Sequence, residues 1–318
     1  MSDDDLGPLL RAEIAQPVGE QIAAIAAAAE HRHGAVAAVL FYGSCLRESS
    51  VQNKVVDLYL IVDSYKEAHG GRLSALFNRA LPPNVYYLET AYGDAVVLRA
   101  KYAVCSLADF AAGAGGRWFH PYLWARFAQP SRLAYCRNEA TRTAITAILA
   151  RAARKMVEEG LMLMEQNFST RDLWTAVFRE TYRTELRAEA PDRADKLYDA
   201  NQGYFEQVGN AVLATLRVPA AATAAPPAGP SPLQWMPLEQ ARTAVRARWL
   251  LRRAQGKLLS VLRLMKAAFT FVGGPDYLLW KIERHSGVAV TLTPWQRRHP
   301  ILASSFLFWR LYRKGAFK

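Results

Sequence analysis

The chain has 318 residues, of which 51% are hydrophobic and 21% charged, and its formal net charge is +12. This composition excludes an intrinsically disordered protein, and the length is sufficient for two domains with a sizeable core. The excess charge lies in the last quarter: residues 233–318 hold 16 Lys and Arg against three Asp and Glu, whereas residues 1–232 hold 24 against 25. Charge concentrated in one segment predicts a polyanionic partner, either nucleic acid or an anionic membrane surface.

Cysteine usage and the first residues bear on the compartment. Cys45, Cys105 and Cys136 are odd in number and too widely spaced for a metal motif, which favours a reducing environment. Cys45 follows a Gly-Ser pair, but no neighbouring residue supplies the base that a nucleophilic cysteine needs. The start of the sequence is acidic and lacks the apolar region of a signal peptide, so we expect a cytoplasmic location.

The first third of the chain predicts a helix followed by a small α/β unit. An alanine-rich stretch predicts one helix over residues 6–32, within an N-terminal segment of residues 1–33. Apolar and β-branched runs then predict an α/β domain over residues 34–112, a mixed sheet with flanking helices. The expected strands cover residues 36–42, 55–62, 84–88 and 95–104, and one helix covers 71–80.

A Gly-Ser turn, Gly43-Ser44, separates the first two strands, and the second strand carries one carboxylate, Asp57. Phosphoryl and nucleotidyl transfer depend mainly on positioning phosphates and a divalent cation. A glycine lets the backbone approach a triphosphate, the serine offers an amide and a hydroxyl, and an aspartate binds the cation. The turn and Asp57 therefore suit a nucleotide site. The alternative is an ordinary turn beside a buried strand whose aspartate is simply hydrogen-bonded.

Residues 113–218 are expected to form a mostly helical domain. Apolar residues at helical spacing predict a long helix over residues 138–166. Ser169 or the residue after it is expected to cap the next helix, because a hydroxyl there accepts from the first helical amides. A further helix is predicted over residues 192–216.

After a proline-rich linker over residues 219–232, the chain becomes basic and amphipathic over residues 233–318. A helix predicted over 238–271 has an apolar stripe of Leu251, Leu258, Leu262, Met265 and Phe269. Residues 301–312 are apolar and aromatic, with basic residues on both sides. Two interpretations stay open: helices at an anionic membrane surface, or helices packed on the core with a solvated basic face. Apolar runs are too short to span a bilayer, so we expect no transmembrane segment.

Four sequence blocks occur in order between residues 38 and 187: Tyr42-Gly43-Ser44 followed by Val56-Asp57-Leu58-Tyr59, then Val85-Tyr86-Tyr87, then Lys101-Tyr102 followed by Val104 and Ser106, and Tyr182-Arg183-Thr184-Glu185-Leu186-Arg187. A short segment, Ala125-Arg126-Phe127, precedes Pro130. Together they resemble the translocator-maintenance type of phosphatidate cytidylyltransferase, the mitochondrial CDP-diacylglycerol synthase of the nucleotidyltransferase superfamily. Tyr59 stands where other nucleotidyltransferases carry a second carboxylate, which that family also lacks, and Glu185 stands where the family has an aspartate.

The resemblance implies a nucleotidyltransferase domain followed by a winged-helix-like domain, with the CTP site wholly before residue 190. It implies transfer of CMP from CTP to phosphatidic acid, with release of pyrophosphate and with magnesium as cofactor. Asp57, Lys101 and Glu185 would act in catalysis; Asp57 would bind the metal, and Glu185 would be a second ligand or the partner of an arginine. Substrate contacts would come from Tyr42, Gly43, Ser44, Tyr102, Arg126, Tyr182 and Arg187. For each of the cations Lys101, Arg126 and Arg187, the alternative is a surface or salt-bridging residue.

The implied partners are CTP, phosphatidic acid and an anionic membrane surface, and no nucleic acid is expected. Such a protein would lie peripherally on the inner, cytoplasmic face of a membrane, or on the matrix side in a mitochondrion. Two other classes stay open: a nucleotidyltransferase with a soluble acceptor, and a degenerate nucleotidyltransferase fold serving as a membrane or RNA adaptor. The missing second carboxylate favours the adaptor, whereas magnesium-dependent CTP binding would count against it.

Overall fold

The computed structural model describes residues 6–47, 51, 54–93, 96–164, 167–186, 190–216, 239–270 and 293. Four of the predicted features lie outside these residues: Arg187, the linker over 219–232, the side chain of Phe269 and the aromatic stretch over 301–312.

The N-terminal segment contains two helices, so the prediction of one helix over residues 6–32 is wrong. α1 spans Leu6–Ile14 and α2 spans Glu20–Glu30. Pro17 lies between them, and a proline inside a helix removes a backbone donor and clashes with the preceding turn. The two helices diverge there and pack on different cores.

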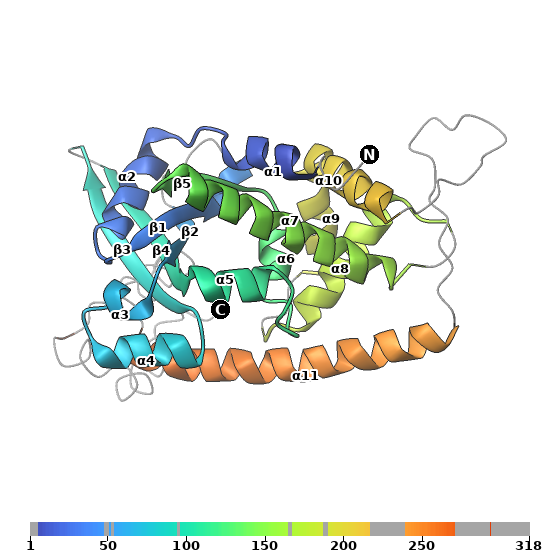
Figure 1. The fold of residues 1–318 in the computed structure, drawn as a ribbon. Helices are drawn as coiled ribbons and strands as arrows, with labels where there is room; N and C mark the ends of the chain where they lie inside the picture. Colours follow the sequence, from blue (N-terminus) through green and yellow to red (C-terminus); the bar gives the residue numbers. More distant parts are fainter. Residues whose placement is uncertain are drawn as a thin grey trace, which may run out of the picture.

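A five-stranded mixed sheet lies at one end of the molecule (Figure 1), in the order β3-β4-β2-β1-β5. Its strands are β1 Val36–Tyr42, β2 Val55–Val62, β3 Asn84–Tyr92, β4 Val96–Ser106 and β5 Ser131–Cys136. β2 and β4 are parallel, and the other neighbouring pairs are antiparallel. The two strands around the Gly-Ser turn and the β3–β4 hairpin are confirmed, with β3 four residues longer than predicted.

β5 corrects the expected division of the chain, because its residues fall in the region predicted to be mostly helical. It is an edge strand that pairs with β1, so the sheet takes in chain well beyond residue 112. One buried core runs from α1 through the sheet and the helical region to Trp249. The α/β part and the helical part therefore share this core.

The two faces of the sheet carry different cores, as the alternation of side chains along a strand requires. On β2, Tyr59 and Ile61 point to the helical region, whereas Leu58 and Leu60 point to the other core. That second core is covered by α2, α3 and α4, and the first by α1, α5, α6 and the helices that follow. The short helices are α3 Tyr65–Ala68, α4 Arg72–Ala80, α5 Leu107–Ala114 and α6 Trp124–Phe127.

The helical region contains α7 Glu139–Leu161, α8 Thr170–Arg183, α9 Arg193–Asp199 and α10 Gln202–Thr215. The predicted cap of α8 is confirmed: Ser169 and Asp172 form a reciprocal capping box. The single helix predicted over 192–216 is wrong, because the chain leaves helical geometry at Asn201, where φ is −139°. The Asn201 side chain donates instead to the Leu197 carbonyl at 3.0 Å, which closes α9.

α11, Glu239–Thr270, confirms the predicted basic helix but packs in an unexpected orientation. It runs along the lower side of the molecule in Figure 1, with α4 beside one end. Its buried side is made of Val245, Trp249, Arg252, Gly256 and Lys266. The predicted apolar stripe points away from the core: Leu251, Leu258 and Met265 are 63%, 61% and 60% exposed.

A buried carboxylate explains this orientation. Glu159 of α7 is 2% exposed and Arg252 is 3% exposed. Arg252 donates two hydrogen bonds to the two Glu159 oxygens at 2.7 and 2.8 Å, and Arg248 donates a third at 2.8 Å. Lys155 adds an ion pair at 2.8 Å. Burial alone would raise the pKa of Glu159, but its bonds from Arg252 and Lys155 outweigh burial and hold that pKa at about 2.

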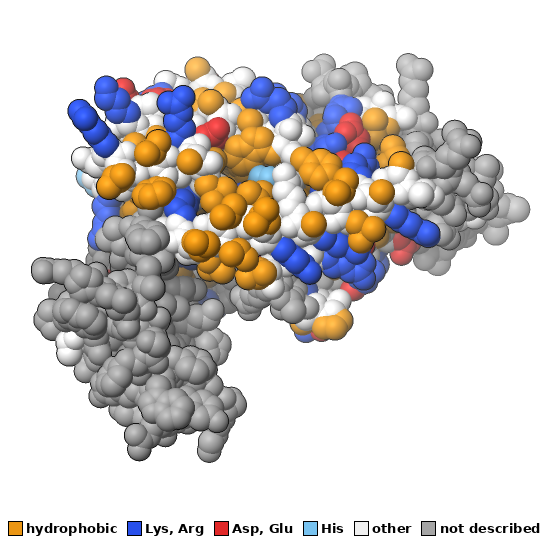
Figure 2. Space-filling view, turned by 90° about the horizontal axis from the view of Figure 1, so that it is seen from below, with side chains coloured by type: hydrophobic (Ala, Val, Ile, Leu, Met, Phe, Trp, Pro, Cys, Tyr) orange, Lys and Arg blue, Asp and Glu red, His pale blue; other side chains and the backbone are white. Residues whose placement is uncertain are grey.

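The outward stripe of α11 joins exposed side chains of α4 into one surface, here called the outer apolar face. Figure 2 looks onto this side of the molecule and shows hydrophobic side chains gathered on it with basic ones between them. Its members are Leu73, Leu76 and Phe77 of α4 and Leu250, Leu251, Leu258, Val261, Leu262, Leu264 and Met265 of α11. In the described part of the chain, no helix has the length and apolar character needed to cross a membrane.

Candidate active site

The Gly-Ser turn packs directly against Asp57. β1 ends at Tyr42, which lies opposite Asp57 in the antiparallel β1–β2 pair. Gly43 has a φ of +89°, in the left-handed region that favours glycine. A Cβ atom at Gly43 would lie 3.0 Å from Asp57 Oδ2, so only glycine lets the turn approach the carboxylate this closely. Ser44 is exposed and begins a short 3₁₀ turn, Ser44–Arg47.

Lys101 is brought to the same carboxylate by the parallel pairing of β2 with β4. Asp57 and Lys101 are register partners, and Lys101 Nζ lies 3.8 Å from Asp57 Oδ1. Both side chains keep substantial exposure, 41% for Lys101 and 30% for Asp57. A loose, accessible ion pair of this kind leaves both groups able to bind a ligand of mixed charge.

Arg126, from the short helix α6, faces this edge of the sheet. Its guanidinium carbon lies 5.6 Å from the Tyr42 ring centroid and 4.6 Å from that of Tyr122. Arg263 of α11 lies over the same Tyr122 ring, at 4.1 Å. Burial would raise the pKa of Tyr122, but the two guanidinium groups lower it. Two arginines from distant parts of the sequence thus share one aromatic support.

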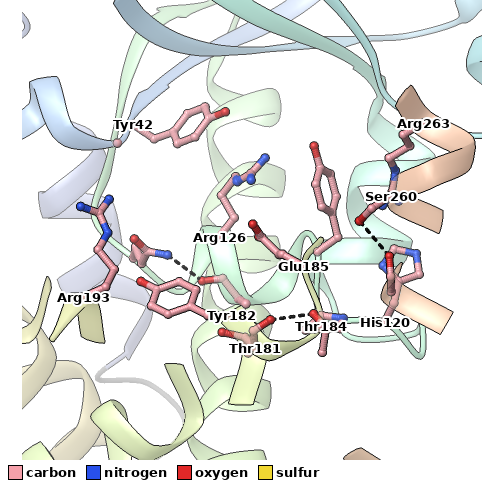
Figure 3. A pocket seen from close by; sticks show the side chains of 16 residues that line it. Tyr42, His120, Arg126, Thr181, Tyr182, Thr184, Glu185, Arg193, Ser260 and Arg263 are labelled. Atoms are coloured by element: carbon pink, nitrogen blue, oxygen red, sulfur yellow. Dashed lines mark hydrogen bonds between the residues drawn. The ribbon is translucent and has the colours of Figure 1, made fainter. Parts of the chain in front are cut away.

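Glu185 and Tyr182 complete the wall formed by the end of α8. Figure 3 shows Glu185 beside Arg126, with Tyr42 across the pocket and Arg263 and Ser260 entering from α11. The charge of Glu185 acts on both Arg126 and Arg263. Glu185 thus acts on the two arginines through its charge, without a direct ion pair to either among the described residues.

Two adjoining cavities occupy this place. The smaller, about 180 Å³, includes Gly43 and His120, and the larger, about 510 Å³, includes Lys101, Val85 and Leu264. Both are lined by Tyr42, Tyr122, Arg126, Glu185, Ser260 and Arg263. Their volumes bracket the low end of the range typical of small-ligand sites. The residues expected at the CTP site lie before residue 190, and α11 adds a further wall to the cavities beside them.

Tyr102 does not belong to this site. It follows Lys101 directly in β4, so its side chain points to the opposite face of the sheet. There it is 2% exposed, bonds His33 Nε2 at 3.2 Å and stacks on Tyr86. The predicted substrate contact for Tyr102 is withdrawn. Of the other predicted residues, the structure gathers Tyr42, Gly43, Asp57, Lys101, Arg126, Tyr182 and Glu185 around the cavities.

Several lining residues were not predicted, above all Tyr122 and Arg263. Tyr122 lies in an aromatic stretch that matches no motif, so the sequence offers no signal for it. For Arg263 the sequence does give a signal, because Arg263 lies on the flank of α11 between the apolar stripe and the opposite basic face.

The donor set at Asp57 suits magnesium held partly by a ligand's phosphates. In the described residues, no cluster of three or more His, Cys, Asp or Glu side chains is placed to hold a metal. Magnesium commonly uses only one or two carboxylates and takes its other oxygens from phosphates and water. The accessible carboxylate of Asp57, beside the Gly43 turn, fits that pattern.

Fold and site together define an α/β protein with a cationic cleft between a glycine turn and a docked amphipathic helix. No protein-family model matches this sequence, and a search of curated proteins gives no match.

Proposed function

We propose that this protein is a magnesium-dependent nucleotidyltransferase that moves CMP from CTP to phosphatidic acid at a membrane surface. The observation that carries the proposal is the contact of the Gly43 turn with Asp57, with Lys101 alongside and Arg126 across the cleft. The mixed sheet and the order of its motif residues support a nucleotidyltransferase fold, and the sequence resemblance implies a winged-helix-like second part. The outer apolar face supports a peripheral membrane location.

In the proposed reaction, a phosphate oxygen of phosphatidic acid attacks the α-phosphorus of CTP, and pyrophosphate leaves. The nucleophile is already an anion, so charge neutralisation and orientation matter more than a general base. Gly43 and Ser44 would bind the triphosphate through backbone amides and a hydroxyl, and Lys101 and Arg126 would neutralise its charge. Asp57 would hold magnesium, which when bound neutralises phosphate charge.

The outer apolar face gives the membrane part of the proposal its structural support. Exposed apolar side chains from two adjacent helices exceed the scattered surface hydrophobics that are usual in water. Exposed Arg246 and Lys257 lie on the same helix and can meet anionic headgroups. Together they match an interfacial helix pair that lies on a bilayer without crossing it.

One assay tests the proposed function. Purified protein is incubated with labelled CTP, magnesium and phosphatidic acid in mixed micelles, and the lipid phase is scored for cytidylate. We expect CDP-diacylglycerol, lost without magnesium. Label found only on a water-soluble acceptor would instead indicate a different nucleotidyltransferase, and the absence of both turnover and magnesium-dependent CTP binding would indicate an adaptor.

Replacing Lys101 with Ala is expected to raise KM for CTP or lower kcat by about 10- to 100-fold, because one phosphate cation is lost. Steady-state kinetics with varied CTP measures this, and Lys101→Arg is expected to restore part of the activity. Lys66→Ala, at an exposed lysine of helix α3, is the matched control and should have no effect. If Lys101→Ala has the same kinetics as its control variant, Lys101 is an ordinary surface residue.

The double substitution Leu258→Ser and Leu262→Ser is expected to weaken binding to phosphatidylcholine–phosphatidylglycerol vesicles at least about tenfold, since each leucine inserted in a membrane contributes about 1.5–3 kcal/mol. Both side chains are already exposed, so the melting temperature should hardly change. Vesicle co-sedimentation measures the effect. Val97→Ser, at an exposed apolar position on β4, is the control. Unchanged vesicle binding by the double variant would contradict a membrane role for this face.

A further inference from the structure

Arg126 and Arg263 are like charges near enough for Arg126 to lower the pKa of Arg263, and no carboxylate of the described residues forms an ion pair with either. Both lie over the Tyr122 ring, and Nε of Arg263 is buried without a hydrogen-bond partner in the described part of the chain. Glu185 influences both electrostatically, yet forms no ion pair with either among the described residues. His120 carries no charge at pH 7, because burial and the charge of Arg263 lower its pKa to about 4. It therefore does not neutralise the two arginines.

Holding two guanidinium groups together in a partly dehydrated cleft is costly, and the cost shows at Arg263, whose pKa is lowered chiefly by burial. A doubly charged anion between them would offset that cost. Arginine pairs are suited to phosphate, because each planar guanidinium can donate two parallel hydrogen bonds to its oxygens. The cleft is therefore built for a phosphate group at this point.

The surroundings of the pair differ on its two sides. The smaller cavity is lined by Tyr42 and by Gly43, whose turn contacts Asp57. The larger cavity also takes in Lys101 but is mainly apolar, with side chains from β3, β4, α11 and the segment after α8: Val85, Ala103, Leu264, Ala267 and Leu186. Leu264 also belongs to the outer apolar face, so this groove opens onto that face.

We infer that Arg263 and Arg126 hold the phosphate of an amphiphilic phosphomonoester, whose apolar chains lie in the groove along α11 and leave toward the outer apolar face. The inference rests on the proposed function and names the acceptor side of the same site. α11 then has two roles: it lies on the membrane and it supplies a cation to the acceptor. A nucleotide has no need of an apolar groove on this side of the arginines, which is why we assign the groove to the acceptor.

Binding without turnover tests the assignment. Titration calorimetry measures the affinity of the full chain for dioctanoyl phosphatidate, for glycerol 3-phosphate and for magnesium-CTP. Arg263→Gln is expected to weaken dioctanoyl phosphatidate binding about 10- to 100-fold and to leave CTP affinity within about twofold. Arg151→Gln, at an exposed arginine of α7, is the matched control and should change neither. Arg263→Lys should recover part of the loss.

A second variant tests the groove independently of Arg263. Ala267→Trp fills the apolar groove and is expected to weaken dioctanoyl phosphatidate at least about tenfold while sparing glycerol 3-phosphate and CTP. Wild-type protein should bind dioctanoyl phosphatidate far more tightly than glycerol 3-phosphate. Equal affinity for the two would show that only a free phosphate is recognised and would overturn the lipid assignment.

Other outcomes separate this inference from the proposed reaction. Loss of CTP affinity in Arg263→Gln, or no change in either affinity, would overturn the acceptor role of Arg263. Arg263-dependent phosphatidate binding in a protein that forms no CDP-diacylglycerol would leave the acceptor site standing and remove the proposed reaction. If the protein forms CDP-diacylglycerol and neither Arg263→Gln nor Ala267→Trp changes phosphatidate binding, the proposed reaction would stand and the acceptor site would be removed.

Discussion

Replacing Asp57 with Asn is expected to lower cytidylyl transfer by about 10³-fold or more while leaving the fold intact. Asn keeps the size and one oxygen of the side chain but removes the charge on which a cation depends. Among the described residues, Asp57 forms only the loose 3.8 Å pair with Lys101 and joins no buried ion-pair network, so stability should change little. Turnover at saturating magnesium and CTP, together with the melting temperature, measures both parts.

Two companion variants sharpen this result. Asp63→Asn changes another carboxylate just after β2, one that pairs with Arg137 on the surface, and should keep full activity. Gly43→Ala places a methyl group 3.0 Å from Asp57 Oδ2 and requires a strained φ of +89°, so it should impair turnover without touching the carboxylate itself. Normal activity in folded Asp57→Asn protein would remove the carboxylate from the mechanism.

Replacing Glu159 with Gln is expected to lower the free energy of unfolding by about 3–5 kcal/mol, because Arg252 would remain buried without its counter-charge. Denaturant titration measures the loss. Glu139→Gln, which disrupts only exposed pairs with Arg11 and Arg142, is the control and should cost less than about 1 kcal/mol. The double variant Glu159→Met with Arg252→Met should recover much of the stability, since it leaves no buried charge unpaired.

The same carboxylate predicts a pH dependence. The pKa of Glu159 in the folded protein is about 2, below its ordinary value of 4.5. Its contribution to stability is therefore fully present above about pH 4.5 and is lost as the pH falls toward 2. The difference in stability between wild type and Glu159→Gln should shrink over that interval. A difference that is small at pH 7 and constant with pH would show that the cluster does not hold α11 in place.

Local patterns in the sequence were sufficient for most of the elements. The runs that became β1 and β2 are continuous and apolar because both faces of these central strands are buried, and the β3–β4 hairpin is marked by its turn. The long helix α7 and the cap at Ser169 depend on contacts within one or two turns of helix. Such features are encoded by neighbours in the chain, so they can be read before any tertiary contact is known.

One error was avoidable at the level of the sequence. Once Lys101 and Tyr102 are placed in one strand, alternation sends them to opposite faces, and only one of them can reach Asp57. The pairing with Asp57 decides that it is Lys101.

Tertiary structure alone decided the rest. β5 is a short edge strand with arginine in its middle, and only pairing with β1 identifies it. The sequence of α11 indicates an apolar side and a basic side, and in water the apolar side would be expected to face the core. The core instead offers Glu159, a buried carboxylate about 90 residues away in the chain, and a helix turned the other way would leave it without the two hydrogen bonds from Arg252. That long-range pairing turns the leucines outward and brings Arg263 beside Arg126 over Tyr122. No periodicity within the helix can specify which of its sides meets a partner charge in another part of the fold.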